Sequence, residues 1–202
     1  MKKEVAYYMR RLYRQQLTTT SGGNISAKQN HSIFITPSGI DKGEIQTEEI
    51  GKIDLEGNSI ESRHKLSTET PMHIAIYKAR PDIKAIIHAH PPYGTAYASS
   101  NKNLNSELTS EGRLILGEIA FAKYKLMGTQ ELADVVAKSA KDSNVILMEN
   151  HGIIALGKTL LEAFDRLEVL EFTAKINFIT ETLNMKKPLT EEQLKQIDTM
   201  NQ

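Results

Sequence analysis

Two histidines stand at the end of an apolar segment rich in β-branched residues. Residues 84–88 predict a buried strand, and His88 and His90 are two positions apart at its end. Because alternate residues of a strand point to the same face of a sheet, both imidazole rings can reach one metal ion. Two unrelated histidines are the alternative, but this spacing at the end of an apolar strand favours a pair of metal ligands.

A second apolar segment is also followed by a histidine. Residues 144–148 predict another buried strand, and His151 comes shortly after it, next to Gly152, which lets the backbone turn sharply. This turn by itself needs no metal. Ligands tend to bind at strand ends in open α/β sheets, so if the two strands lie side by side, His151 joins His88 and His90. Three imidazoles with an open fourth position are typical of a catalytic zinc site.

A glutamate stands at the start of a predicted helix. Ser67 or Thr68 can cap this helix, Pro71 fits near its first turn, and the helix runs to about Ala79. One interpretation is that Glu69 only complements the helix dipole, as glutamates in a first turn often do. The other is that Glu69 reaches the metal or acts as a general base beside it. The sequence alone leaves both interpretations open.

Three loops rich in glycine and hydroxyl side chains are candidates for anion binding. They comprise residues 21–24, 36–39 and 67–68. Backbone N–H groups in glycine turns and at helix starts bind phosphate, and hydroxyl groups add further donors. Ordinary turns are the alternative, and the chain has neither a P-loop nor a Gly-x-Gly-x-x-Gly fingerprint.

The composition narrows the class of protein and the kind of metal site. The 202 residues suit one domain, and 25 Lys plus Arg balance 25 Asp plus Glu, which argues against a nucleic-acid binder. The chain has no cysteine, so any zinc must be bound by His, Asp or Glu, as in catalytic rather than structural sites. Because no apolar run resembles a signal peptide or a membrane span, we expect a soluble cytoplasmic protein.

The elements that must position these residues alternate between helices and strands. This alternation predicts an α/β fold with one sheet covered by helices. His31 and His64 lie in polar stretches and are expected at the surface, whereas His73, four residues after Glu69, is expected to cap or support rather than to bind metal. The expected helices span residues 3–16, 67–79, 129–141 and 160–183, with a short last helix from 188, and the expected strands span 32–36, 52–55, 84–88, 144–148 and 153–156.

Five short motifs follow one another along the chain. In order they are Ser-Gly-Gly-Asn-Ile-Ser at 21–26, Ile-Thr-Pro-Ser-Gly at 35–39, Ser-Thr-Glu-Thr-Pro-Met-His at 67–73, Ile-Ile-His-Ala-His at 86–90 and Glu-Asn-His-Gly at 149–152. Together they resemble the class II aldolase and adducin-head family, and the resemblance covers about residues 3 to 183. It implies a single α/β domain over residues 1–202, with a central, mainly antiparallel sheet flanked by helices on both faces. It also implies a homotetramer with active sites between subunits.

The resemblance assigns roles to particular residues. It implies a divalent ion, normally Zn2+ but also Mn2+ or Co2+, on His88, His90 and His151. It implies that Glu69 binds the resting metal and becomes the catalytic acid/base. The phosphate of a small sugar phosphate is expected on Gly23, Asn24, Ser38, Gly39, Ser67 and Thr68.

The activity that the resemblance implies is a metal-dependent aldolase reaction. A ketose 1-phosphate, such as L-fuculose 1-phosphate or a 5-deoxypentulose or methylthioribulose 1-phosphate, is cleaved to dihydroxyacetone phosphate and an aldehyde through a metal-stabilised enediolate. Alternatives are a ribulose-phosphate 4-epimerase, whose branch has Asp where this chain has Glu69, a methylthioribulose-1-phosphate dehydratase, and a non-catalytic, adducin-like scaffold. No tyrosine follows Tyr124, and residues 108–112 contain none. The two tyrosines that such aldolases use to handle the aldehyde are therefore not evident.

Overall fold

A single mixed sheet runs through the centre of the computed structural model, which describes residues 1–100 and 102–201. Within these residues eight strands pair in the order β4-β3-β2-β1-β5-β8-β7-β6, and every neighbouring pair is antiparallel except β6 and β7. The predicted α/β fold with a mainly antiparallel sheet is confirmed. The strands are β1 (Asn24–Gln29), β2 (Ser32–Ile35), β3 (Gly51–Asp54), β4 (Ser59–Glu61), β5 (Ala85–Ala89), β6 (Ile119–Ala122), β7 (Val145–Met148) and β8 (Gly152–Gly157).

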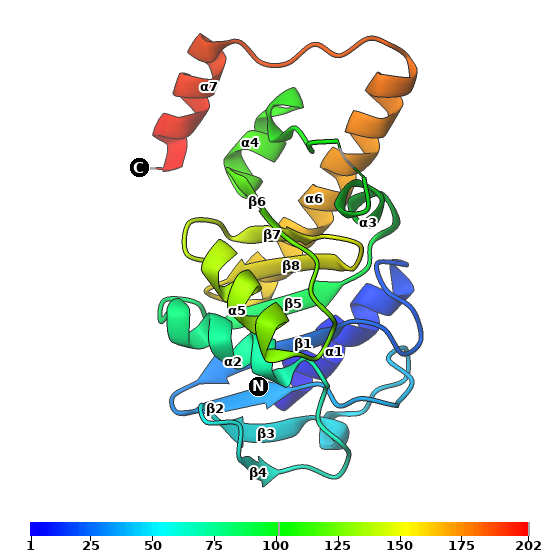
Figure 1. The fold of residues 1–202 in the computed structure, drawn as a ribbon, viewed down its shortest axis with the longest axis vertical. Helices are drawn as coiled ribbons and strands as arrows, with labels where there is room; N and C mark the ends of the chain where they lie inside the picture. Colours follow the sequence, from blue (N-terminus) through cyan, green and yellow to red (C-terminus); the bar gives the residue numbers. More distant parts are fainter. Residues whose placement is uncertain (101, 202) are drawn as a thin grey trace.

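Helices cover both faces of the sheet (Figure 1). One face packs against α1, α3 and α6, and the opposite face packs against α2 and α5, each through its own cluster of buried apolar side chains. The α4 and α7 helices contact each other, and α4 also contacts α6. The helices are α1 (Lys2–Arg14), α2 (Thr70–Ala79), α3 (Pro92–Ala98), α4 (Ser110–Leu116), α5 (Gln130–Ser139), α6 (Leu160–Thr182) and α7 (Glu191–Asp198), with short 3-10 helices at Thr47–Glu49, Ser106–Leu108 and Thr199–Asn201.

The burial of β5 on both faces explains why its sequence is continuously apolar. Ile86 packs into the cluster with α2 and α5, whereas Ile87 packs into the cluster with α1 and α6. A strand that is covered on both sides needs apolar residues at every position rather than at alternate ones. His88 has the same parity as Ile86 and so lies on the α2 side of the sheet.

No helix among the described residues, not even the 23-residue α6, is long and apolar enough to cross a lipid bilayer.

Several elements differ from those expected. The β4 and β6 strands and the α3 and α4 helices were not predicted, because they are short and lack a clear apolar period. The six-residue β1 was not predicted because it lacks that period. The cap expected for α2 is wrong: Glu69 is the N-cap residue, and neither Ser67 nor Thr68 occupies that position. Ser67 instead forms the preceding turn, where its Oγ accepts from the Glu69 N–H at 3.3 Å.

The polar loops meet at one edge of the sheet because the antiparallel pairing places strand starts beside strand ends. The register aligns Asn24, at the start of β1, with His88 near the end of β5. It also aligns Ala89 with Ile153 near the start of β8, so the turn between β7 and β8 lies at the same edge. The end of β2 reaches this edge through its pairing with β1.

The strand beside β5 is not the one that the sequence suggested. Convergence of the histidines was argued for the case in which the two apolar strands, β5 and β7, lie side by side, but β8 lies between them. Strand β8 turns back tightly from β7, and Asn150 adopts a positive φ of 52° in that turn. The turn places His151 just before β8, beside the end of β5. The three histidines therefore lie together even though β8, and not β7, is the strand next to β5.

Candidate metal centre

Three histidines gather at the sheet edge. His88 is fully buried at the end of β5, His90 follows the strand, and His151 lies in the turn between β7 and β8. One ring nitrogen from each lies within 4.8 Å of the others. The ring centroids are 4.6 Å apart for His88 and His90 and 4.9 Å apart for His88 and His151. The structure therefore brings together the three residues that the sequence indicated as ligands.

Glu69 closes this cluster from the start of α2. Its Oε2 lies 3.1 Å from His88 Nε2, and its Oε1 lies 3.2 Å from His151 Nε2. The side chain makes no capping hydrogen bond to its own helix. The dipole interpretation therefore does not describe what the carboxylate contacts, because the carboxylate is turned toward the imidazoles.

The donor atoms fit a divalent ion. Buried polar atoms nearly always have a hydrogen-bond partner, yet His88 Nε2 and Glu69 Oε1 are buried without one. His88 Nδ1 donates to the Ile153 carbonyl oxygen at 3.0 Å, which leaves the Nε2 lone pair directed at the cluster. Imidazole nitrogens and a carboxylate oxygen without thiolates suit zinc and also manganese or cobalt. These residues are therefore able to hold the ion that the sequence implied.

The electrostatics of the site keep His90, His151 and Glu69 in the form that binds metal. For His88, burial acts to lower the pKa, but the adjacent Glu69 carboxylate outweighs burial and raises it. Burial, and then the neighbouring His88, lower the pKa of His90 to about 3 and that of His151 to about 4. Burial alone would raise the pKa of Glu69, but the adjacent His88 and then His151 hold it well below its usual range. At neutral pH the site thus offers two neutral imidazoles and an ionised carboxylate, which are the ligating forms.

Two of the expected phosphate loops lie against each other. Pro37 and Leu66 form an isolated antiparallel bridge, and Ser38 Oγ donates to the Leu66 carbonyl oxygen at 2.8 Å. Ser67 is buried and Thr68 is exposed just beyond this bridge. Residues 38–39 and 67–68 therefore form one surface at the sheet edge that carries the histidines.

A buried lysine, which the sequence analysis did not single out, supports this surface. Lys42 is 1% exposed, and its ammonium group donates to the Pro37 carbonyl oxygen. Burial lowers its pKa to about 8, although Glu49 opposes the shift. Its position three residues after the glycine-containing loop at 36–39 resembled that of an ordinary surface lysine, so no sequence signal marked it.

The remaining loop brings its backbone against the metal site. Gly23 has a φ of +66°, and a Cβ there would lie 2.7 Å from the His88 carbonyl oxygen. Asn24 follows it, and both ends of its side-chain amide are already engaged: Nδ2 donates to Glu69 at 2.7 Å, and Oδ1 lies 2.5 Å from His73 Nε2. The side chain of Asn24 thus lies beside the carboxylate, and His73 takes the supporting place that was expected of it.

Two glycines with the same backbone geometry allow the close approach of Gly23 to be measured. A non-glycine residue in the left-handed region costs about 1–2 kcal/mol. Gly39→Ala, with a φ of +71° and no neighbouring atom within 4 Å, is expected to lower the free energy of unfolding by about this amount. Gly23→Ala is expected to lower it further, because the new methyl group meets the His88 carbonyl. Equal losses in urea unfolding would show that the contact with His88 is not tight.

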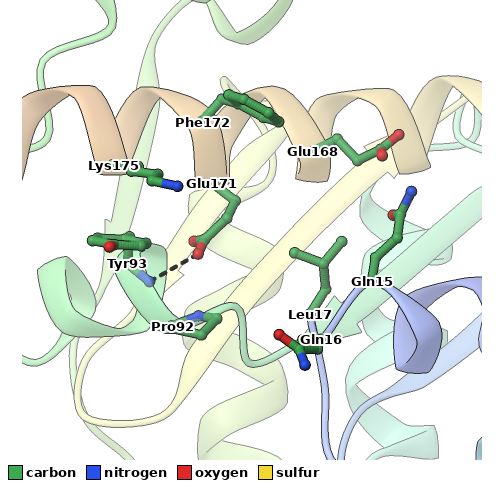
Figure 2. Close-up of a pocket in the computed structure, with 9 residues that line it drawn as sticks. All are labelled: Gln15, Gln16, Leu17, Pro92, Tyr93, Glu168, Glu171, Phe172 and Lys175. Atoms are coloured by element: carbon green, nitrogen blue, oxygen red, sulfur yellow. Dashed lines mark hydrogen bonds between the residues drawn. The ribbon is translucent and has the colours of Figure 1, made fainter.

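A separate hollow of about 400 Å³ lies beside the segment that leads into β1 (Figure 2). Neither Glu69 nor any of the three clustered histidines lines it, so we place the chemistry at the cluster. In Figure 2 the Glu171 carboxylate points to the start of α3, where it accepts from Tyr93 N at 3.0 Å and from Gly94 N at 2.8 Å. The sequence analysis missed this role of Glu171, which fixes the chain directly after His90 and Pro91. The hollow is lined by Gln15, Gln16, Leu17, Pro92, Tyr93, Glu168, Glu171, Phe172 and Lys175.

Three clustered imidazoles, of which His88 is fully buried, and a carboxylate at the edge of a helix-covered sheet define the class of metal-dependent enzymes. Residues 3–178 match the family model of the class II aldolase and adducin N-terminal domain. The chain belongs to this family and is an enzyme, an aldehyde-lyase. The resemblance in the five motifs is thereby confirmed.

Several proteins are similar to this chain over nearly its whole length. The L-fuculose phosphate aldolase of Methanocaldococcus jannaschii is 38% identical over 178 residues, which cover 88% of this chain and 96% of that protein. The 5-deoxy-D-ribulose 1-phosphate aldolase of Bacillus thuringiensis is 32% identical, and the match covers 97% of this chain and 92% of that protein. The 3-oxo-tetronate 4-phosphate decarboxylase of Haemophilus influenzae is 29% identical, and the match covers 94% of this chain and 91% of that protein. A solved L-fuculose 1-phosphate aldolase superposes with a TM-score of 0.90 at 35% identity, covering 97% of this chain and 93% of that one.

Proposed function

We propose that this protein is a metal-dependent aldolase that reversibly cleaves a ketose 1-phosphate to dihydroxyacetone phosphate and an aldehyde. The observation that carries the proposal is the position of Glu69, whose buried carboxylate lies within about 3 Å of two of the three clustered histidines. A carboxylate in that position can both complete a metal site and exchange a proton with a carbon atom held beside the metal. The relatives named above as aldolases support the same reaction class.

The proposed ligands are His88, His90 and His151, with Glu69 in the resting enzyme. Zinc is the proposed ion, and the donor set also accepts manganese or cobalt. When bound, a divalent ion supplies Lewis-acid polarisation of the substrate carbonyl. The hydrogen bond from His88 Nδ1 to the Ile153 carbonyl keeps that ligand in the required tautomer.

The substrate phosphate is proposed to bind on the surface next to Glu69. Backbone N–H groups of glycine turns and side-chain hydroxyls are its donors, and the ammonium group of Lys42 lies beneath this surface. Holding the phosphate there orients the neighbouring carbons toward Glu69 and lowers the entropic cost of the reaction. The proposed residues are Gly23, Asn24, Ser38, Gly39, Ser67 and Thr68.

The proton transfers of the reaction fall to Glu69. In cleavage, the Glu69 carboxylate takes the proton of the C4 hydroxyl, the bond between C3 and C4 breaks, and the aldehyde departs. The electron pair of that bond remains on the three-carbon fragment as an enediolate. Glu69 then delivers a proton to C3 and releases dihydroxyacetone phosphate. In synthesis Glu69 removes the same proton, and the carbon nucleophile adds to the aldehyde.

The substrate proposed first is L-fuculose 1-phosphate, and a 5-deoxypentulose 1-phosphate is second, because relatives with these activities cover nearly the whole chain. Decarboxylation of a 3-oxo acid phosphate is a second candidate function, favoured by the relative from Haemophilus influenzae. Decarboxylation and aldol cleavage both break a bond at the carbon next to a carbonyl and leave the electron pair on that carbon. The group that departs is carbon dioxide in the first reaction and an aldehyde in the second. The epimerase, the dehydratase and the non-catalytic scaffold have no specific observation in their favour, and the complete metal site argues against the scaffold.

Release of dihydroxyacetone phosphate from a panel of sugar phosphates tests the proposal. Metal-loaded protein is expected to cleave at least one ketose 1-phosphate, and a chelator is expected to abolish the release. The preferred member of the panel identifies the aldehyde. Carbon dioxide released from a 3-oxo acid 4-phosphate, with no cleavage of any ketose phosphate, would replace the aldolase proposal by the decarboxylase.

The proposal also covers the oligomeric state and the cellular location of the protein. We infer a cytoplasmic homotetramer from the family resemblance, with active sites between subunits. Sedimentation at several protein concentrations measures the mass of the assembly. A stable monomer with full turnover would contradict this part of the proposal and leave the reaction untouched.

A further inference from the structure

A row of buried, hydrogen-bonded side chains leads away from Glu69 on the α2 side of the sheet. Asn24 Nδ2 donates to Glu69 Oε2 at 2.7 Å, and Asn24 Oδ1 lies 2.5 Å from His73 Nε2. His73 Nδ1 lies 2.7 Å from Ser26 Oγ, which lies 2.8 Å from the Tyr77 hydroxyl. The four residues beyond Glu69 are each at most 4% exposed, so water does not compete for these bonds.

The direction of every bond in this row follows from the carboxylate. Ionised Glu69 can only accept, so Asn24 must present its NH2 group to Glu69 and its Oδ1 to His73. Because Oδ1 also only accepts, Nε2 of His73 carries the proton and donates. The lone pair of that neutral ring then lies on Nδ1 and accepts from Ser26, which in turn accepts from Tyr77. Every hydrogen bond in the row therefore has a defined donor and acceptor, and each donor lies on the side away from Glu69.

The protonation states agree with this arrangement. Burial, and then neighbouring His88, lower the pKa of His73 to about 3, although Glu69 opposes the shift. Burial also raises the pKa of Tyr77 above its usual value. At neutral pH the imidazole is therefore uncharged and the phenol keeps the proton that it donates.

We propose that His73 is a positioning residue for Glu69: it holds the Asn24 amide with Nδ2, rather than Oδ1, facing the carboxylate. This inference rests on the proposed function of Glu69 as the base. If the amide turned over, two acceptors would face each other at hydrogen-bond distance, and the buried carboxylate would lose a donor. His73 thus fixes the orientation of Glu69 through Asn24. Bases held in this way need no reorientation before proton transfer.

The tautomer of His73 tests the inference without any substrate. In long-range proton–nitrogen correlation spectra of the metal-loaded protein, His73 is expected as the neutral Nε2–H form from about pH 6 to about 8, where an ordinary imidazole titrates. The spectrum of a His73→Gln protein assigns the signals. An Nδ1–H tautomer or an imidazolium ion at neutral pH would overturn the inference, because neither fits the one-directional row.

Kinetics of matched variants test the consequence. His73→Phe fills the space without donating, and we expect kcat to fall about 100-fold, the scale of a small misplacement, with KM and bound metal unchanged. His73→Gln keeps a donor within reach of Asn24 and is expected to recover most of kcat. Tyr77→Phe leaves the bond between His73 and Asn24 in place, so its kcat is expected to stay well above that of His73→Phe.

The outcomes separate this inference from the proposed function. Equal losses in His73→Phe, His73→Gln and Tyr77→Phe, or loss of bound metal from His73→Phe, would indicate a merely structural role and overturn the inference. If the wild-type protein cleaves no sugar phosphate, the proposed function falls, and the tautomer measurement alone decides whether the row is arranged as described.

Discussion

Glu69→Gln is expected to lower kcat for dihydroxyacetone phosphate release by about 10²- to 10⁴-fold, the usual contribution of a general base. Glutamine has the same shape, but its amide cannot take or return the proton at C3. The three histidines still hold the ion, and the phosphate surface is unchanged, so bound metal and affinity for inorganic phosphate are expected to stay at wild-type levels. Steady-state kinetics, elemental analysis and phosphate titration measure the three quantities.

Glu149→Gln is the matched control for this change. Glu149 lies two residues before His151, and its carboxylate accepts from Tyr124 N at 2.8 Å, a bond that a glutamine oxygen can also accept. The same chemical substitution next to the site, but outside the cluster, is expected to leave kcat unchanged. Full turnover by Glu69→Gln would show that another group moves the proton.

His88→Ala is expected to remove the ion and with it the activity. His88 is the most deeply buried of the three clustered histidines, and it is anchored through Nδ1 to the Ile153 carbonyl. Substitution of groups that only support metal ligands already costs about 10- to 100-fold, so loss of a ligand is expected to cost at least about 100-fold in activity. Metal content after dialysis and cleavage of the preferred ketose phosphate measure both effects.

Two further variants separate loss of metal from loss of folding. His151→Ala removes a less buried ligand, with a side chain 14% exposed, and is expected to lose the ion while the far-ultraviolet spectrum stays that of the wild type. His64→Ala removes an imidazole that is 37% exposed and lies 3.4 Å from Glu49, and it is expected to change neither metal nor turnover. Retention of the ion and of activity by both His88→Ala and His151→Ala would contradict the proposed centre.

The sequence indicated the three histidines that cluster because they lie at or next to the ends of strands with a strong apolar signal. Strands β5, β7 and β8 are covered on both faces, so they appear as uninterrupted apolar runs, and a histidine next to such a run is conspicuous. Strand order was harder to predict. Whether β7 or β8 lies beside β5 depends on pairing between distant segments, which no local pattern records.

The same logic explains why β1 was missed. On its α2 side the strand carries Asn24 and Ser26, which are polar because they belong to the hydrogen-bonded row behind Glu69. A strand with polar residues on one buried face does not show the apolar pattern expected of a core strand. The supporting residues of the site therefore concealed the element that carries them.

The insertion of β8 between β5 and β7 also bears on how the chain acquires its metal. The hydrogen bonds that hold the site together join widely separated parts of the chain. His88 bonds to a carbonyl oxygen 65 residues away, and Asn24 bonds to Glu69, which is 45 residues away. Such non-local contacts form slowly, because the entropy of closing a long loop is lost before the contacts stabilise the chain. We therefore expect a refolding chain to bring the three histidines together only once β8 has paired with β5. Uptake of the proposed ion would then report this pairing, and an ion that binds only the folded chain would stabilise it over the unfolded state.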